Sequence, residues 1–237
     1  MTETTIPRGN TLPRIRPWLG IAAAASFVVA SVMALFWAPT DAVQGDVYRI
    51  LYVHVPLAWL AYLAFVIVFL ASVGWLWTKR PFFDAVAVAS AEIGVLFTGL
   101  FLVAGSIWAK PTWGVWWDWD PRLTTTAVLL LAFAGILALR RFIDDPVKRG
   151  TWSAVATIIA YVDVPIVYFS VRWWNSLHQQ QSSPATVSSQ FHLPLRLNAF
   201  GVLFLMTGFI MLRARLASRR LATELAPPPQ ELAGELA

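Results

Sequence analysis

Long apolar stretches separated by short polar connections dominate the pattern of this chain. Six stretches are long enough, or nearly so, to cross about 30 Å of hydrocarbon as helices. They lie near residues 18–37, 53–77, 87–109, 123–139, 152–171 and 197–212. Because only helices and closed barrels satisfy backbone groups in lipid, the pattern predicts an all-α, polytopic membrane protein with six transmembrane helices.

The six stretches form one predicted transmembrane domain, residues 18–216, between two short polar ends. Residues 1–17 are expected to be an N-terminal arm, and residues 217–237, with three consecutive prolines, a C-terminal tail. The first stretch follows three arginines, as a secretory signal does, but its apolar run is longer than a typical signal core. We therefore interpret it as a retained helix, with a cleaved signal as the alternative.

Composition supports this class, and the distribution of charge orients the chain. The sequence is 58% hydrophobic and 13% charged, with a mean hydropathy of +0.62. The net charge of +5 could indicate nucleic acid, but thirteen of the eighteen basic residues fall on one side of a six-span topology. Basic residues concentrate on the cytoplasmic side of membrane proteins, which predicts two cytoplasmic termini and no nucleic-acid partner. Those on the opposite side are Arg49, Lys110, Arg122, Arg172 and Arg196.

The densest chemistry lies in residues 108–124, here called the tryptophan segment, which the charge pattern places on the outer side. Five tryptophans fall within twelve residues there. Its prolines and charges are Lys110, Pro111, Asp118, Asp120, Pro121 and Arg122. A tryptophan offers a rigid apolar face and one N–H donor, which suits a partly wet surface. An interfacial aromatic belt explains the scattered tryptophans elsewhere, but not this density, which predicts a platform for a broad, flat, apolar ligand.

All three histidines map to the outer side, where a boundary histidine with a wet tip is the ordinary interpretation. His54 and His178, however, flank the tryptophan segment in sequence, and neutral imidazole is a strong axial ligand of haem iron. A porphyrin matches the tryptophan faces, and its carboxylates would pair with Arg49, Lys110 or Arg122. His192 lacks an adjacent tryptophan pair and is expected to be structural.

The sequence leaves the role of two intramembrane carboxylates open and carries no motif for several common activities. Glu92 and Asp163 lie within apolar stretches, where carboxylates are costly and are candidates for relay groups or for satisfied packing residues. The chain has no cysteine, which excludes disulfides, thiolate ligands and a thioether to haem within it. No nucleotide-binding or hydrolase signature is present. These observations favour a binding protein over an ATPase or hydrolase.

The run from Trp113 to Thr124, Trp-Gly-Val-Trp-Trp-Asp-Trp-Asp-Pro-Arg-Leu-Thr, closely resembles the signature of the haem-handling membrane proteins of cytochrome c maturation. That signature alone marks a broad superfamily that includes the larger haem lyases. His54-Val-Pro, Trp174-Asn-Ser-Leu-His178-Gln and the short length narrow the resemblance to the haem exporter protein C family of System I, over about residues 18–216.

The resemblance implies a periplasmic haem platform with His54 and His178 as axial ligands of the iron. The residues expected to contact the porphyrin are Trp113, Trp116, Trp117, Trp119, Asp120 and Arg122, with Arg122 on a propionate. The ligand would be haem b, delivered at the outer face of the bacterial inner membrane to a membrane-anchored haem chaperone. Further implied partners are the ATPase and membrane subunits of an ABC transporter and a small single-span membrane subunit. ATP hydrolysis then belongs to partners, and this chain is expected not to be an enzyme.

Two other functions compete with this interpretation. A membrane cytochrome b that keeps its haem for electron transfer would usually hold it between helices inside the bilayer, whereas these histidines lie at outer helix ends. A permease that moves haem through the bundle would need a continuous polar path, for which Glu92 and Asp163 are the available support.

Overall fold

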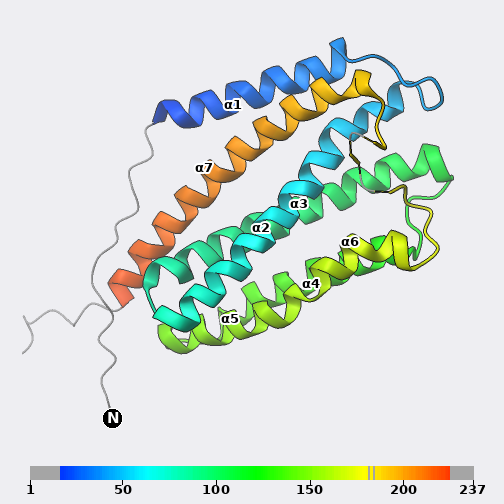
Figure 1. The fold of residues 1–237 in the computed structure, drawn as a ribbon. Coiled ribbons are helices and arrows are strands. Elements are labelled where there is room, and N and C mark those ends of the chain that lie inside the picture. The colour runs from blue at the N-terminus through cyan, green and yellow to red at the C-terminus, as the bar shows by residue number, and fades with distance from the viewer. Residues whose placement is uncertain (1–16, 181, 184, 225–237) are drawn as a thin grey trace, which may run out of the picture.

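The computed structural model describes residues 17–180, 182–183 and 185–224, so most of the predicted arm and the chain after residue 224 lie outside the described residues. These residues form helices joined by short connections (Figure 1). A π-helical turn, Met33–Trp37, extends α1, and 3-10 turns, Asp46–Ile50 and Ser189–Phe191, precede α2 and α7. The helices are α1 Pro17–Val32, α2 Leu51–Thr78, α3 Pro81–Trp113, α4 Pro121–Leu139, α5 Pro146–Tyr161, α6 Asp163–Trp173 and α7 His192–Glu224.

Six helical segments are long and apolar enough to span a membrane, which confirms the predicted all-α, six-span fold. The fifth segment consists of α5 and α6 together. α2 and α3 lie in the middle of the bundle, with α1 and α7 on one flank and α4, α5 and α6 on the other (Figure 1). α1 begins and α7 ends at the same end of the bundle, as an even number of spans requires (Figure 1). The other end carries the tryptophan segment and is called the site end below.

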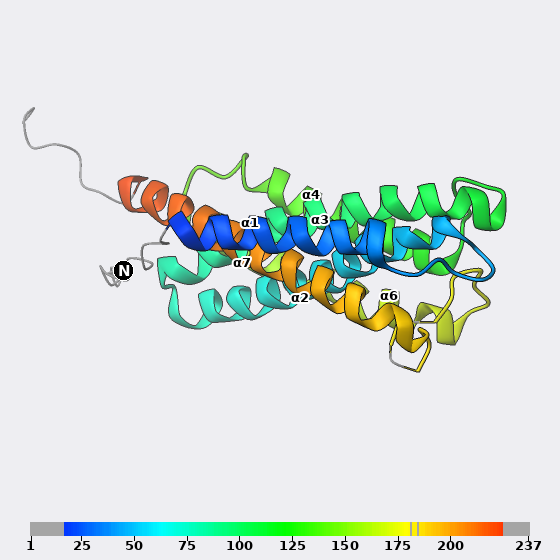
Figure 2. The ribbon, with the colours of Figure 1, turned by 90° about the horizontal axis from the view of Figure 1, so that it is seen from above.

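The packing of α1 on the bundle depends on a close approach between α1 and α7. α1 packs along α7, as the view from above also shows (Figure 2). A Cβ at Gly201 of α7 would lie 2.9 Å from the Cα of Phe27 in α1. Only glycine therefore allows the two backbones to pack at this distance.

Apolar side chains fill the rest of the bundle in two main clusters. One joins α2, α3 and α7, and the other joins α2 and α3 to α4, α5 and α6. In the second cluster the fully buried rings of Phe65 and Phe133 pack with centroids 4.2 Å apart and planes inclined by 33°. Phe65 lies midway along α2, so this pair fills the middle of the bundle.

Local sequence fixes where several helices begin. Pro81, Pro121 and Pro146 occupy the first turns of α3, α4 and α5, where the missing proline N–H costs nothing. Asp120 and Asp145 are the N-caps of α4 and α5, and each accepts backbone N–H bonds through its side chain. α3 ends where Gly114 turns the chain with a φ of 81°.

Three helix bounds differ from those expected. α3 continues through Pro111 to Trp113, so the non-helical part of the tryptophan segment is confined to residues 114–120. α7 runs to Glu224, past the expected end of the sixth span near residue 212. The fifth span is broken at Val162, because the ring of Pro165 excludes a continuous helix bond to residue 161.

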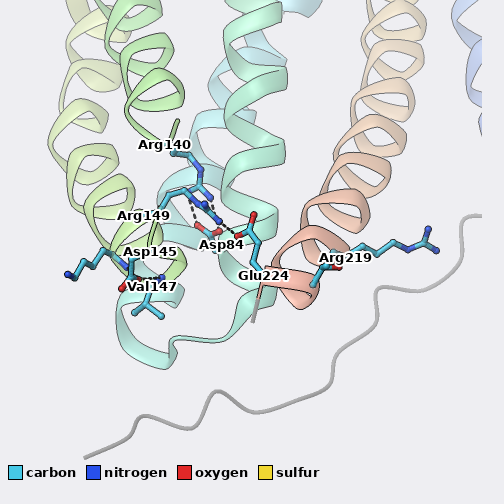
Figure 3. Close-up of polar contacts among 9 residues, drawn as sticks. Asp84, Arg140, Asp145, Val147, Arg149, Arg219 and Glu224 are labelled. Atoms are coloured by element: carbon cyan, nitrogen blue, oxygen red, sulfur yellow. Dashed lines mark hydrogen bonds and ion pairs between the residues drawn. The ribbon is translucent and has the colours of Figure 1, made fainter. Parts of the chain in front are cut away.

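Ion pairs tie the helices together toward the opposite end (Figure 3). Arg140 at the end of α4 donates two bonds of 2.8 Å to Asp84 of α3, and both side chains are largely buried. Arg149 pairs with Glu224 and so joins α5 to the end of α7. Glu92, expected as an intramembrane acid, receives two bonds of 2.5 Å from Arg213 of α7, which favours its interpretation as a satisfied packing residue.

Candidate functional site

A cavity of about 320 Å³ opens among α2, α3, α4, α6 and the segment that follows α6, at the site end. Ligand pockets in proteins typically measure about 300–1,000 Å³ and combine apolar walls with a few polar groups. Here both histidines that flank the tryptophan segment line the cavity. Other polar or aromatic side chains in the cavity lining are Tyr62, Trp108, Trp113, Trp117, Arg122 and Tyr168.

His54 lies in the first turn of α2 and is only 9% exposed. Its Nδ1 is 2.9 Å from the carbonyl oxygen of Phe101 in α3. A carbonyl can only accept, so Nδ1 carries the proton and Nε2 keeps its lone pair. The ring edges of Phe101 and Trp108 pack on the imidazole with centroids 5.7 and 5.8 Å away. The ring is thus held in one orientation and one tautomer.

His178 lies in the non-helical segment after α6, and its ring follows the same logic. Its Nδ1 is 2.9 Å from the carbonyl oxygen of Gln179 and 3.5 Å from Nη1 of Arg122. The shorter contact makes Nδ1 a donor to the carbonyl, which leaves Nε2 unprotonated. Burial lowers the pKa of His178 and Arg122 lowers it further, against opposing contributions from the Gln179 carbonyl and Asp120. The ring is therefore neutral at neutral pH.

The fold brings these two imidazoles together although 124 positions separate them in the sequence. Their ring centroids are 6.3 Å apart and their planes are inclined by 32°. The ring of Trp113 also meets His178 edge-on, at 6.1 Å between centroids. Two neutral rings with free Nε2 atoms thus share one apolar cavity.

The predicted tryptophan platform divides into two groups. Trp113 and Trp117 line the cavity, together with Trp108 at the end of α3. Trp116 and Trp119 lie outside the cavity lining and are 58% and 78% exposed. The division arises because α3 ends at Trp113 and the following residues turn without helical periodicity. A porphyrin contact stays a prediction for all four tryptophans, and the cavity lining supports it for Trp113 and Trp117.

The two predicted polar contacts of the porphyrin also have different surroundings. Arg122 lines the cavity, donates from Nη2 to the carbonyl of Tyr168 at 3.2 Å, and keeps a buried Nε without a partner. Asp120 is 5% exposed and does not line the cavity. Its Oδ1 accepts from the backbone N–H of Arg122 and its Oδ2 from that of Leu177. The carboxylate thus joins α4 to the segment that carries His178.

The remaining candidates lie away from the cavity. Lys110 donates to the carbonyl of Gly114, and Arg49 pairs with Asp46 and donates to the carbonyl of Ala34 in the π-helical turn after α1. Arg122 is thus the cationic side chain that the structure places in the cavity wall. His192 begins α7 and its Nε2 lies 2.7 Å from the carbonyl of Val187, in accordance with the structural role expected for it.

Sequence reasoning missed two residues that shape the site. Gln44, from the first connection, lines the cavity and accepts from the indole N–H of Trp108 at 2.7 Å. Gly105 of α3 faces His54 so closely that a Cβ there would lie 2.8 Å from its Cε1. The signal for Gly105 was the spacing of Phe101, Gly105 and Trp108, which puts them on one helix face. For Gln44 the available signal was the Asp41-x-x-Gln44 turn, which predicts a turn at this position but not a place in the site.

Comparisons of the chain with a family model and with known proteins agree on one family. Residues 8–226 match the family model described as heme exporter protein C. Heme exporter protein C of Bradyrhizobium diazoefficiens is 38% identical over 216 residues, which cover 87% of this chain and 81% of the relative. Its counterpart in Escherichia coli strain K12 is 39% identical over 201 residues, 84% of this chain and 82% of the relative. A Marchantia polymorpha protein named as cytochrome c biosynthesis ccmC-like and mitochondrial is 37% identical over 191 residues, 79% and 81%.

Proposed function

Because the chain belongs to the heme exporter protein C family, we propose that it binds haem at the periplasmic face of the bacterial inner membrane and delivers it to a membrane-anchored haem chaperone. Family membership assigns the protein to haem transport and c-type cytochrome biogenesis. Six spanning segments make it a multi-pass membrane protein. The binding site, the face and the acceptor are the parts proposed here.

The observation that carries the proposal is the histidine pair. A metal–imidazole bond is about 2 Å long and the ring centre lies about 1 Å behind the bonding nitrogen, so two axial imidazoles on one metal have centroids about 6 Å apart. The centroids of His54 and His178 are 6.3 Å apart. Ligating histidines usually donate their other N–H to a carbonyl or carboxylate, and both rings do so. The centroid separation and the two supporting N–H bonds both support bis-histidine ligation of haem iron by this pair.

The walls of the cavity fit the rest of the haem group. Trp113 and Trp117 supply apolar ring surface on the side of the tryptophan segment. Arg122 has a buried Nε–H without a partner, and a buried donor of this kind is costly unless an acceptor meets it. A haem propionate is such an acceptor, and guanidinium–carboxylate pairing is strong and directional. We assign the propionate contact to Arg122.

The periplasmic orientation rests on the distribution of basic residues, with thirteen of eighteen on the side of the termini. Reporter fusions test it directly. A fusion after Arg141 or after Leu216 should report a cytoplasmic location, and a fusion within residues 114–119 a periplasmic one. A periplasmic reporter after Leu216 would refute both the orientation and the proposed face.

Delivery to a chaperone requires a site that a second protein can reach. The cavity is open to the surface at the site end, and Trp116 and Trp119 expose further aromatic surface beside it. If bound haem forms part of the surface that the chaperone contacts, the chaperone should bind better to haem-loaded protein, and by linkage should tighten haem binding equally. Co-purification of the chaperone with haem-loaded and haem-depleted protein measures this. Equal recovery in both states would show that haem is cargo only.

Ligand substitution tests the site itself. Replacing His54 or His178 with glycine should change the absorption spectrum of purified, haem-loaded protein and weaken haem retention. Added imidazole should restore part of both, because it can occupy the missing axial position. His192→Ala is the matched control and should bind haem normally. Unchanged spectra in both glycine variants would show that other groups ligate the iron.

The structure bears on the two competing functions. A permease would need an open polar path from the cavity to the end of the bundle that carries the termini. Among the described residues, the buried rings of Phe65 and Phe133 and then the Asp84–Arg140 ion pair lie in that direction, and they argue against such a path. For a cytochrome b, both ligands would have to be fixed inside the helix bundle, whereas His178 belongs to a non-helical segment. Haem that stays bound in the presence of the chaperone would favour the electron carrier.

A further inference from the structure

The two histidines are held in unequal ways. His54 belongs to α2, and the groups that orient it belong to α3: the Phe101 carbonyl, the close face of Gly105 and the indole of Trp108. The indole is itself fixed by Gln44. Two long packed helices therefore set the position of this ring, and it cannot move without disturbing their interface.

His178 is oriented mainly by its own segment. Its ring bonds to the carbonyl of the next residue, and its backbone N–H bonds to Oγ of Ser176. These contacts set the shape of residues 174–180 but do not attach them to the bundle. Attachment comes from the edge-on contact of Trp113 with the ring, and from the N–H of Leu177, which donates to Oδ2 of Asp120 at 2.8 Å.

Asp120 is built to make that attachment rigid. It is 5% exposed, and its two oxygens have separate partners. Oδ1 caps α4 through the N–H of Arg122 at 2.9 Å, and Oδ2 holds the residue that precedes His178. One carboxylate thus joins the start of a spanning helix to the backbone next to the proposed ligand.

We infer that Asp120 is a positioning residue that latches the His178 segment onto the bundle, so that His54 is the fixed ligand of the haem and His178 the exchangeable one. This inference rests on the proposed function. During transfer the bond between iron and Nε2 of His178 breaks and a bond from a donor atom of the acceptor forms in its place. No electron is gained or lost, and the iron stays bound to His54 until the acceptor holds it.

Substitutions at Asp120 can separate the latch from the helix cap. Asn and Ser are both favoured N-cap residues and retain an oxygen for the N–H of Arg122. Asn presents an amide N–H₂ where Oδ2 was, so two donors face each other at Leu177. Ser has a single, shorter oxygen. Asp120→Asn and Asp120→Ser should therefore both release the segment while α4 stays capped.

Asp145 provides the matched control at the start of α5 (Figure 3). Its Oδ1 accepts from both Val147 and Lys148, which is the same cap chemistry. No hydrogen bond to its second oxygen corresponds to the Leu177 bond among the described contacts of this residue. Asp145→Asn and Asp145→Ser should thus show the effect of altering a cap without altering a latch.

The first measurement is hydrogen–deuterium exchange of the full-length protein before haem is added. Loss of one hydrogen bond should accelerate exchange in peptides covering residues 174–180 by about fivefold in both Asp120 variants. In the Asp120 variants, peptides covering residues 121–126 should exchange as in the parent protein. In both Asp145 variants, peptides covering residues 174–180 should also exchange as in the parent protein. Exchange in residues 174–180 that equals that of the Asp145 variants would overturn the latch. This result does not depend on whether the protein binds haem.

The second measurement follows coordination by resonance Raman and absorption spectroscopy after haem is added. The Asp120 variants should contain a fraction of five-coordinate haem, which imidazole converts to six-coordinate. His178→Gly should retain five-coordinate haem, whereas His54→Gly should be largely empty. Equal retention in the two glycine variants would overturn the assignment of fixed and exchangeable ligands. A parent protein that takes up no haem would instead refute the proposed function, while the exchange result would still decide the latch.

Discussion

Gly105 faces the ring of His54 at so short a distance that one added methyl group would displace the proposed ligand. A Cβ at this position would lie 2.8 Å from Cε1 and 3.3 Å from Nδ1 of the imidazole. Cβ contacts under 3.0 Å essentially never occur, and ordinary contact begins at 3.4 Å. Gly105→Ala must therefore move the ring away from α3 by about 0.6 Å, because the packed interior offers no slack.

The displacement acts on the bond that orients the ring. Phe101 lies on the same helix as Gly105, so a ring pushed from α3 also leaves the Phe101 carbonyl, now 2.9 Å from Nδ1. Loss of such a supporting bond typically weakens metal binding by about 10- to 100-fold, and we expect a loss of this size for haem. Overpacking costs about 1–3 kcal/mol and alanine returns about 0.5–1 kcal/mol to the helix, so the free energy of unfolding should fall by at most about 2.5 kcal/mol.

Gly99 is the matched control, because it lies in the same helix and its Cβ would meet nothing within 4 Å. The assay is an absorbance titration of both variants with haem in the same detergent, alongside thermal unfolding to confirm folding. Gly99→Ala should bind haem as the parent does. If Gly105→Ala binds haem as tightly as Gly99→Ala, then His54 is not held where the structure places it, or it is not a ligand.

Three further expectations follow from other parts of the structure. Trp117→Ala should weaken haem binding in the same titration more than Trp116→Ala, because only the first side chain lines the cavity; the reverse order would contradict the assignment of the cavity. Asp84→Ala leaves Arg140 buried and unpaired, so thermal unfolding of the purified protein should show a loss of about 3–5 kcal/mol, and an unchanged melting temperature would refute the burial of that pair. Because the pKa of His178 is lowered, its neutral ring persists to more acidic pH, so the loss of haem binding on acidification should have its midpoint below the ordinary imidazole value of about 6.5. A midpoint at or above that pH would show that the ring is not buried as described.

The architecture could be predicted from the sequence because lipid imposes a strong and local constraint. A helix that must satisfy its own backbone in hydrocarbon needs a long apolar run, and such runs are visible without any knowledge of tertiary contacts. The bounds were harder to predict where helices leave the bilayer. α7 continues to Glu224 because Arg213 and Glu224 find partners on other helices, which are contacts that no local pattern contains.

The candidate site was predicted in its residue types and less well in its geometry. His54, His178, Trp113, Trp117 and Arg122 were named from chemistry, spacing and the family resemblance, and the fold gathers them around one cavity. The separate placement of Trp116 and Trp119 depends on the turn at Gly114, which changes the direction of successive side chains. The role of Asp120 depends on a backbone N–H 57 residues away, and sequence periodicity carries no information about such a bond.

The break in the fifth span changes the helix against which the span packs. α5 packs chiefly on α2, whereas α6 packs chiefly on α4, so the second half of the span leaves the helix that the first half follows. Pro165 enforces the change at Val162, since proline lacks the N–H that would continue the helix. Tyr62 of α2 and Tyr168 of α6 both line the cavity. The Val-Asp-Val-Pro sequence at residues 162–165 thus redirects the half of the fifth span that contributes to the cavity wall.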